Sequence, residues 1–257
     1  MGSIAAPPVL RLAILECDEP VGRTKETYGG YGGLFAALLR HGVVQYPSVY
    51  NGDAAPELRT SKFDVVHGHA YPDLDDVDAV LLTGSKFNSF DDDAWILRLV
   101  DFTRTVLAQQ RVRLIGVCFG HQIIGRALHV GVGRSDAGWE VAVVPVALTD
   151  EGKQLFGVQT LNIHQMHRDI VYELPPGVQP LGHTDRCAIQ GMYAPRRLLA
   201  VQGHPEFDGD IVAELLQRRH EQGIFDRPTF DEAMGRVRHA HDGTRVASAF
   251  LRFLVEG

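Results

Sequence analysis

The sequence predicts an α/β protein with a central, mostly parallel sheet, flanking helices, a small antiparallel extension and helices at the C-terminal end. Three observations lead to this fold class. In the first half of the chain, apolar runs alternate with segments of helical period, as in parallel sheets. After residue 138, strand-like runs follow one another with little helix between them, which favours antiparallel pairing. From residue 207 onward, apolar residues recur at helical spacing.

The elements of the first half rest on local composition. Strands are runs of Leu, Ile, Val and Ala, whereas helices carry apolar residues every three or four positions. We expect the first long helix to end at Gly42, a residue type that commonly follows helices, and the acidic residues 91–93 to lie in the first turn of a later helix. In order, these elements are strand 10–17, helix 32–42, strand 42–50, strand 78–85, helix 91–110, and a strand, turn and helix over 113–128.

The second half continues without an internal repeat, low-complexity tract or obvious linker. We therefore expect one domain over residues 1–257, with a core at about residues 10–223 and a helical extension at about residues 224–257. The strands expected here are residues 139–148, 158–164, 179–184, 187–192 and 197–204, and the helices are residues 210–223, 230–241 and 243–256.

Composition restricts the classes of partner. The chain has 257 residues, 45% of them hydrophobic, which is enough for a sizeable core. A formal net charge of −7 offers no basic footprint for nucleic acid or anionic membranes. Three scattered cysteines, Cys17, Cys118 and Cys187, form no disulfide or zinc pattern and favour a reduced compartment. No secretory signal, lipidation pattern or apolar run of about 20 residues is visible, so a cytoplasmic location is expected.

Two stretches that could suggest a nucleotide or a metal lack the rest of the required pattern. YGGYGG, residues 28–33, has neither the dinucleotide register nor a Walker lysine, and predicts a flexible turn or lid before a helix. HQMH, residues 164–167, has no further ligand at metal-site spacing, and a loop is expected there. We therefore expect neither a cofactor nor a metal.

The stretch RLIGVCFGHQIIGRAL places Cys118 between Gly116 and Gly120, where a buried strand turns into a helix. G-x-C-x-G in this context is the cysteine version of the nucleophile elbow. The glycines let neighbouring backbone come close to a strained turn, and a helix N-terminus favours the thiolate, the reactive form. The alternative is a buried, unreactive cysteine at a strand end.

The stretch VQGHPEF contains the general base that a thiol nucleophile needs. His204 and Glu206 are two residues apart, so in extended backbone their side chains point the same way, and Pro205 favours that conformation at His204. A carboxylate beside an imidazole fixes its tautomer and stabilises the imidazolium. The alternative is a surface pair after a strand. In α/β-hydrolases the acid precedes the histidine, so this chain order argues against that fold.

On GVCFGHQ, GHPEF, the spacing between them and the upstream LLTGS, the sequence resembles the class I (triad-type) glutamine amidotransferases. The resemblance covers about residues 10–223 and implies their flavodoxin-like fold. DDDAWI, GWEV and IHQMHRD further resemble the stand-alone fungal and plant-type members that are similar to the glutaminase half of GMP synthase.

The resemblance implies a role for ten residues. It implies Cys118 as the nucleophile, His204 as its base and Glu206 as the acid that orients the base. It also implies an oxyanion hole formed by the backbone N–H groups of two residues, and a pocket for the amino-acid end of glutamine formed by Gln122 and the backbone of the segment 166–169. The oxyanion residues are Gly84 and Phe119, and the pocket residues are Gln122, Met166, His167, Arg168 and Asp169.

These features predict a cysteine hydrolase that releases ammonia from glutamine or another γ-glutamyl amide through a thioester on Cys118. It would act alone or deliver ammonia to a separate synthetase subunit, because the chain carries no second domain that could use ammonia. Arg168 departs from the small or neutral residue usual in the family, and would either face the pocket or be solvated near Asp169. Two alternatives therefore stay open: an enzyme recruited to another acyl substrate in secondary metabolism, and a non-catalytic or redox-sensing scaffold.

Overall fold

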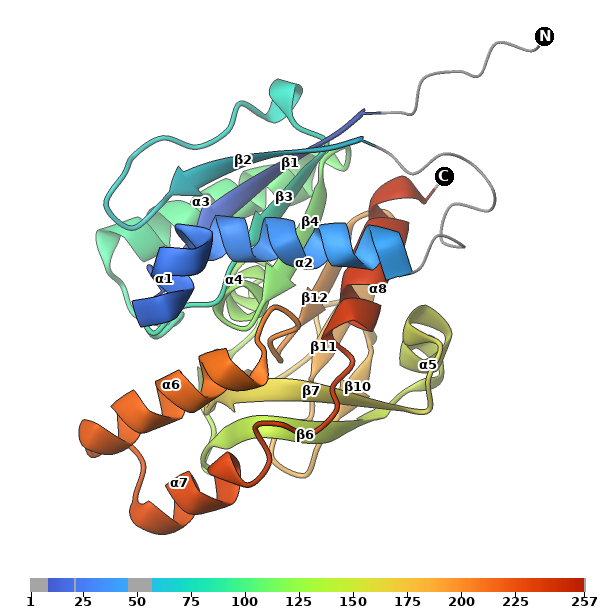
Figure 1. Ribbon diagram of the computed structural model, residues 1–257. Helices are drawn as coiled ribbons and strands as arrows, with labels where there is room; N and C mark the ends of the chain where they lie inside the picture. Colours follow the sequence, from blue (N-terminus) through green and yellow to red (C-terminus); the bar gives the residue numbers. More distant parts are fainter. Residues whose placement is uncertain (1–8, 21, 46–56, 257) are drawn as a thin grey trace, which may run out of the picture.

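A seven-stranded sheet forms the centre of the computed structural model, which describes residues 9–20, 22–45 and 57–256. Its strand order is β2-β1-β3-β4-β12-β11-β9, and the five strands from β2 to β12 are parallel, whereas β11 and β9 are antiparallel. The expected α/β class is thereby confirmed (Figure 1). The strands are β1 (Val9–Glu16), β2 (Glu57–Asp64), β3 (Ala79–Leu82), β4 (Arg113–Val117), β9 (Gln179–Pro180), β11 (Gly191–Ala194) and β12 (Leu198–Val201).

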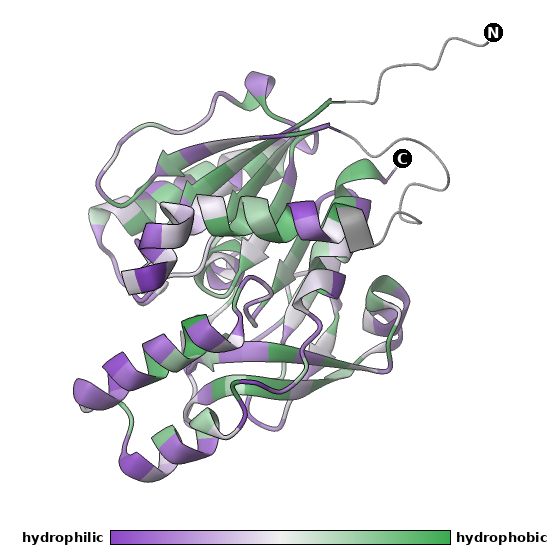
Figure 2. Cartoon of the chain, in the orientation of Figure 1, coloured by the Kyte–Doolittle hydropathy of each residue, from purple (hydrophilic) through white to green (hydrophobic). Residues whose placement is uncertain are grey.

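Helices cover both faces of this sheet. Alternate side chains of each parallel strand point to opposite faces, so the sheet divides its apolar residues between two clusters. One cluster joins the sheet to α2 and α8, where Phe250 and Phe253 are fully buried, and the other joins it to α3 and α4. Figure 2 shows the most hydrophobic colours in the sheet and on the helices that cover it. These helices are α2 (Tyr31–Gln45), α3 (Ala94–Gln109), α4 (Phe119–Ala127) and α8 (Gly243–Val255).

An antiparallel part extends from the carboxyl end of the parallel strands. A three-stranded sheet, β10-β6-β7, and a two-stranded sheet, β5-β8, lie beside the central sheet, and α6 packs over β6 and β7 through a third apolar cluster. α6 and α7 are mostly hydrophilic in Figure 2. The remaining elements are α1 (Gly22–Tyr28), η2 (Leu74–Asp76), β5 (Val132–Arg134), β6 (Glu140–Leu148), α5 (Asp150–Phe156), β7 (Thr160–His167), β8 (Asp169–Val171), β10 (Gly182–His183), α6 (Gly209–Glu221) and α7 (Arg227–Met234).

Near Gly42 the expected order of elements is wrong. α2 continues through Gly42 to Gln45, so residues 42–45 are helical rather than the start of a strand, and residues 46–50 lie outside the described residues. A Cβ on Gly42 would lie 3.0 Å from the Cβ of Ala247, so the missing side chain here lets α8 approach α2. The second strand is instead β2, an edge strand whose polar sequence, ELRTSKFD, gave no apolar signal.

Smaller differences concern the ends of elements. The acidic residues before α3 precede its first turn, and Asp93 is the N-cap residue. Residues 164–167 belong to β7 and not to a loop. α5 was not expected, and α7 begins and ends earlier than residues 230–241. α8 belongs to the core, although it lies in the stretch expected as an extension. Among the described helices, none is long and apolar enough to cross a membrane.

Candidate active site

Cys118 lies at a sharp turn between β4 and α4. Its φ of 52° and ψ of −104° are strained for a residue with a side chain, and its N–H donates to the Val201 carbonyl of β12 at 2.9 Å. A Cβ on Gly116 would lie 2.8 Å from the Gly120 carbonyl oxygen, and one on Gly120 would lie 2.4 Å from that of Leu82. The close approach therefore requires both glycines, and it aims Cys118 beyond the end of the sheet.

His204 and Glu206 follow directly after β12. His204 Nδ1 lies 2.8 Å from Glu206 Oε1, and both side chains are almost completely buried. The backbone turns at Pro205 instead of staying extended, yet the two side chains still meet. The His204 N–H donates to the His164 carbonyl at 2.7 Å, and its ring stacks on Phe207 with centroids 4.1 Å apart. The imidazole is thus held in one orientation.

The loops after β3, β4 and β12 bring Gly84, Cys118 and His204 together. The Cys118 thiolate and the His204 imidazole interact electrostatically, which raises the pKa of His204. A Cβ on Gly84 would lie 2.7 Å from His204 Cε1 and 3.7 Å from Cys118 Cβ, so only glycine fits there. Phe119 is the first residue of α4, where a backbone N–H has no partner within the helix. The expected oxyanion residues therefore flank the thiol.

The charges of this group favour the imidazolium form of His204. Burial alone would lower the pKa of His204, but the Cys118 thiolate and the Glu206 carboxylate outweigh it and raise the pKa to about 10. The second carboxylate oxygen of Glu206 is buried and has no partner among the described residues, so its charge acts mainly on the imidazole. The arrangement can therefore hold His204 as an imidazolium beside Cys118 at neutral pH.

Gln122 lies one turn after Cys118, but its carboxamide already makes hydrogen bonds within the protein. Its Oε1 accepts from Ser89 Oγ at 2.9 Å, and its Nε2 donates to the Asp169 carbonyl at 2.8 Å and to Gln202 Oε1 at 3.1 Å. In this structure Gln122 thus positions the backbone around Asp169 and also lines the same cavity as Cys118, and its contact with substrate stays a prediction.

His167 and Met166 are buried at the end of β7. His167 Nδ1 lies 3.1 Å from the Asp169 carbonyl and its Nε2 lies 3.1 Å from Glu140 Oε2, so both ring nitrogens have protein partners. Met166 contributes apolar surface to the cavities described below. His167 therefore supports the pocket wall from behind and offers no free nitrogen to a ligand.

Arg168 faces the cavity and does not pair with the adjacent Asp169. Its guanidinium lies over the Trp139 ring, 5.1 Å from the centroid, while Asp169 pairs with Arg134 at 3.1 Å. Of the two orientations open from the sequence, the structure thus shows the one that lines the pocket.

Two adjoining cavities meet beside the thiol. The first cavity, about 330 Å³, is lined by Cys118, Gln122 and residues 166–169. The second cavity, about 320 Å³, is lined by Gly84, His204 and Phe207. The thiol therefore opens into one cavity and the imidazole into the other. The residues that line both cavities are Ser85, Lys86, Met166, Arg219 and Gln222.

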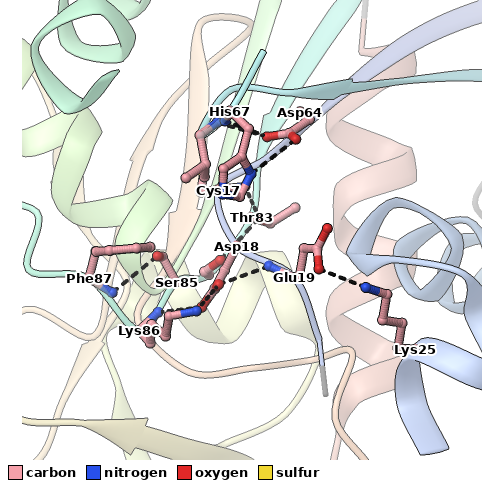
Figure 3. Close-up of polar contacts among 12 residues, drawn as sticks. Cys17, Asp18, Glu19, Lys25, Asp64, His67, Thr83, Ser85, Lys86 and Phe87 are labelled. Carbon is pink, nitrogen blue, oxygen red and sulfur yellow. Dashed lines mark hydrogen bonds and ion pairs between the residues drawn. The ribbon is translucent and has the colours of Figure 1, made fainter. Parts of the chain in front are cut away.

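Lys86, Asp18 and Arg219 are site residues that the sequence did not suggest. Figure 3 shows Asp18, just after β1, accepting from the Lys86 side chain at 2.8 Å and from its backbone N–H at 2.9 Å, which holds the loop after Gly84. The place of Asp18 directly after a buried parallel strand was a signal that could have found it. Arg219 reaches the site from α6, and nothing in its local sequence indicates that position.

A second group of the same three residue types lies close by. Oxygen, nitrogen and sulfur atoms of Glu140, His167 and Cys187 are all within 4.8 Å of one another, close enough to suggest a metal. Burial raises the pKa of Cys187 to about 12, and its thiol donates to the Ile189 carbonyl at 3.4 Å. Glu140 already accepts from Gln190 at 2.7 Å. With a neutral thiol and engaged partners, the group fits a buried hydrogen-bonded network better than a metal site.

Comparison with known proteins identifies the family. The model of the family "Glutamine amidotransferase class-I" matches residues 58–218, more than half of the chain. The chain belongs to the class I glutamine amidotransferases. It is 33% identical over 250 residues to a glutamine amidotransferase-like protein of Schizosaccharomyces pombe, covering 95% of this chain and 98% of that one. It is also 25% identical over 256 residues to gamma-glutamyl peptidase 2 of Arabidopsis thaliana, covering 97% of both.

Solved structures of other amidotransferases share the fold. A glutamine amidotransferase from Thermotoga maritima superimposes with a TM-score of 0.67 at 15% identity, over 96% of this chain and 99% of that chain. A protein from Thermoplasma acidophilum, described as a subunit of GMP synthase, gives 0.53 at 17% identity, over 84% and 98%. The resemblance expected from the two motifs is confirmed, and with it a protein of amide-hydrolysing type.

Proposed function

We propose that this amidotransferase hydrolyses glutamine or another γ-glutamyl amide through a γ-glutamyl thioester on Cys118. One observation carries the proposal: a thiol at a strained elbow lies beside an imidazole whose Nδ1 is 2.8 Å from a buried carboxylate. Such a group supplies a nucleophile, a general acid–base and an orienting acid beside the two cavities.

In the first half-reaction, the Cys118 thiolate attacks the side-chain amide carbon. The carbonyl oxygen becomes an oxyanion, which the backbone N–H groups of Gly84 and Phe119 would stabilise. The C–N bond then breaks, and the His204 imidazolium gives its proton to the departing nitrogen. Ammonia or a free amine leaves, and a γ-glutamyl thioester remains on Cys118.

In the second half-reaction, water replaces the thiol. His204, now neutral, takes a proton from the water as it attacks the thioester carbon. The C–S bond breaks, glutamate leaves, and the thiolate and imidazolium are restored. Glu206 keeps Nδ1 of the imidazole protonated in both halves, so that Nε2 faces the reaction.

The test is release of glutamate from glutamine and from γ-glutamyl peptides by the purified protein. We expect turnover by the wild type and none by Cys118→Ala. Cys17→Ala is the matched control, because Cys17 is buried in the apolar cluster with α3 and α4, whereas Cys118 belongs to the other cluster and lines the first cavity. If Cys118→Ala keeps wild-type turnover, or the wild type turns over no γ-glutamyl compound, the proposal is wrong.

A second candidate keeps these residues but changes the acyl group. The guanidinium of Arg168 lines the first cavity and has no ion-pair partner within the part of the chain that the structure describes, which favours this candidate, since a cation there suits a carboxylate other than that of glutamine. For glutamine itself, the partner would be a separate synthetase subunit that receives the ammonia. The proposed location is the cytoplasm, because a catalytic thiolate must stay reduced.

A further inference from the structure

We propose that Arg219 binds a carboxylate on the amine that leaves, so that the substrates are γ-glutamyl amino acids in preference to glutamine. This inference rests on the proposed function and adds to it a substrate class and the residue that selects it. Three features support it. They are the surroundings of Arg219, the ion pairs that the nearby acidic residues already make, and the volume and lining of the second cavity.

Arg219 is a mostly buried cation without an acidic partner among the described residues. Its Nη1 is inaccessible to solvent and makes no hydrogen bond. The guanidinium instead contacts rings, lying 4.9 Å from the Trp139 centroid and 5.9 Å from that of Phe225. Burying a guanidinium with open donors is costly, and a bound carboxylate would satisfy the donors in the planar geometry that arginine prefers.

The acidic residues that line the second cavity are already neutralised. Asp18 pairs with Lys86 at 2.8 Å and Glu19 pairs with Lys25 at 2.7 Å, as Figure 3 shows. Lys86 therefore already has an acidic partner in Asp18, which also holds its loop. Lys86 is thus not an unpaired cation of the site. Neither of these two carboxylates therefore forms an ion pair with Arg219, and a carboxylate of the ligand would complete the hydrogen bonds of its guanidinium.

The second cavity lies on the side of the leaving group. His204, which would protonate the departing nitrogen, lines this cavity, whereas Cys118, which keeps the acyl group, lines the first. Its volume of about 320 Å³ is about ten times the 30 Å³ that a molecule the size of water or ammonia occupies. The space suits an amino acid or a short peptide.

Arg219 lies where the two cavities meet, whereas Arg168 lines only the first. In a γ-glutamyl amino acid, the carboxylate is attached to the carbon that carries the scissile nitrogen. A carboxylate so close to the broken bond would lie near the junction. Arg219 is therefore the better placed of the two arginines to recognise it.

The experiment compares γ-glutamyl-alanine, γ-glutamyl-alaninamide and glutamine as substrates. We expect the wild type to prefer the acid over the amide by about 10- to 100-fold in kcat/KM, as for a hydrogen-bonded charge pair. Arg219→Gln should lose that preference, because its kcat/KM should fall further for the acid than for the amide or for glutamine, and Arg219→Lys should restore part of it. Arg238→Gln, an exposed arginine paired with Asp210 outside both cavities, is the control.

Calorimetry on Cys118→Ala measures binding of the same acid and amide without turnover. Tighter binding of the acid, lost on adding Arg219→Gln, supports the inference. Turnover that depends on Cys118 without preference for the acid would keep the proposed function and overturn the inference. An equal loss on all three substrates in Arg219→Gln would also overturn it, because it indicates a structural role or contact with the glutamyl part. Absence of any turnover contradicts the proposed function, and binding then decides the inference alone.

Discussion

Cys118, His204 and Glu206 are matched in residue type by a second buried group, Cys187, His167 and Glu140. In the first group the thiol is at a strained turn beside a cavity and lies next to the imidazole. In the second group the thiol donates to a backbone carbonyl. Three side chains of the right kinds are thus present twice, in very different settings.

The histidines and acids of the two groups also differ in what holds them. Burial would raise the pKa of Glu140, but hydrogen bonds from His167, Thr184 and Gln190 hold it below its ordinary value. Glu206 has only His204 as a partner for its carboxylate among the described residues. Three features thus distinguish the reactive group from the structural one. They are backbone strain at the thiol, access to a cavity, and a carboxylate that is only partly hydrogen-bonded.

The largest effect expected from this comparison is on turnover. Cys118→Ala should lower kcat by about four orders of magnitude or more, because it removes the nucleophile. Cys187→Ala should change kcat by less than about tenfold, since its neutral thiol lies outside the reaction. Glutamate release measures both. Comparable losses in the two variants would mean that the groups are not distinct in function.

The two acids should separate activity from stability. Glu206→Gln should lower kcat by about 10²- to 10⁴-fold, because the imidazole loses the carboxylate that orients it. Glu140→Gln should instead lower the free energy of unfolding by about 1–3 kcal/mol, because it weakens the buried interaction of Glu140 with His167. Steady-state kinetics measures the loss of activity in each variant, and denaturant unfolding measures the loss of stability. A Glu140→Gln variant that is stable but inactive would contradict the structural role given to Glu140.

Alkylation compares the thiols directly. At pH 7, iodoacetamide should modify Cys118 at least about 100-fold faster than Cys187 or Cys17, because burial raises the pKa of each of those two thiols to about 12. Peptide mapping of partly labelled protein measures the three rates, and labelling after unfolding supplies the control. Equal protection of all three cysteines would contradict an activated Cys118.

The pKa of His204 should depend on its thiol partner. Burial lowers this pKa, whereas the Cys118 thiolate is the largest contribution that raises it to about 10. Cys118→Ala should therefore lower the pKa by at least about one unit, while Cys187→Ala leaves it unchanged. The ring resonances of His204 followed by NMR between pH 6 and about pH 11 report it. An unchanged pKa in Cys118→Ala would mean that thiol and imidazole are not coupled.

The sequence predicted the parts of the site that depend on local geometry. The elbow at Cys118 follows from the glycines on either side, and the contact of His204 with Glu206 follows from their separation by one residue. Both signals lie within a few residues of chain. The strand order, by contrast, is set by contacts between distant segments, and the polar edge strand β2 carried no apolar signal.

Other parts could not be read from local sequence. Arg219 comes from a helix that follows the site, and its place over Trp139 depends on how α6 packs on β6 and β7. The hydrogen bonds of Gln122 with Ser89 and Gln202 join three segments that are far apart in the sequence. Such contacts depend on tertiary packing, which local patterns do not encode.

The most direct test is to trap the acyl-enzyme. The protein is mixed with a γ-glutamyl substrate, quenched in acid within the first turnovers, digested and mapped by mass spectrometry. We expect one γ-glutamyl group on the peptide that contains Cys118, absent in Cys118→Ala and unchanged in Cys187→Ala. A γ-glutamyl group on Cys187, or turnover without any acylated cysteine, would contradict a thioester on Cys118.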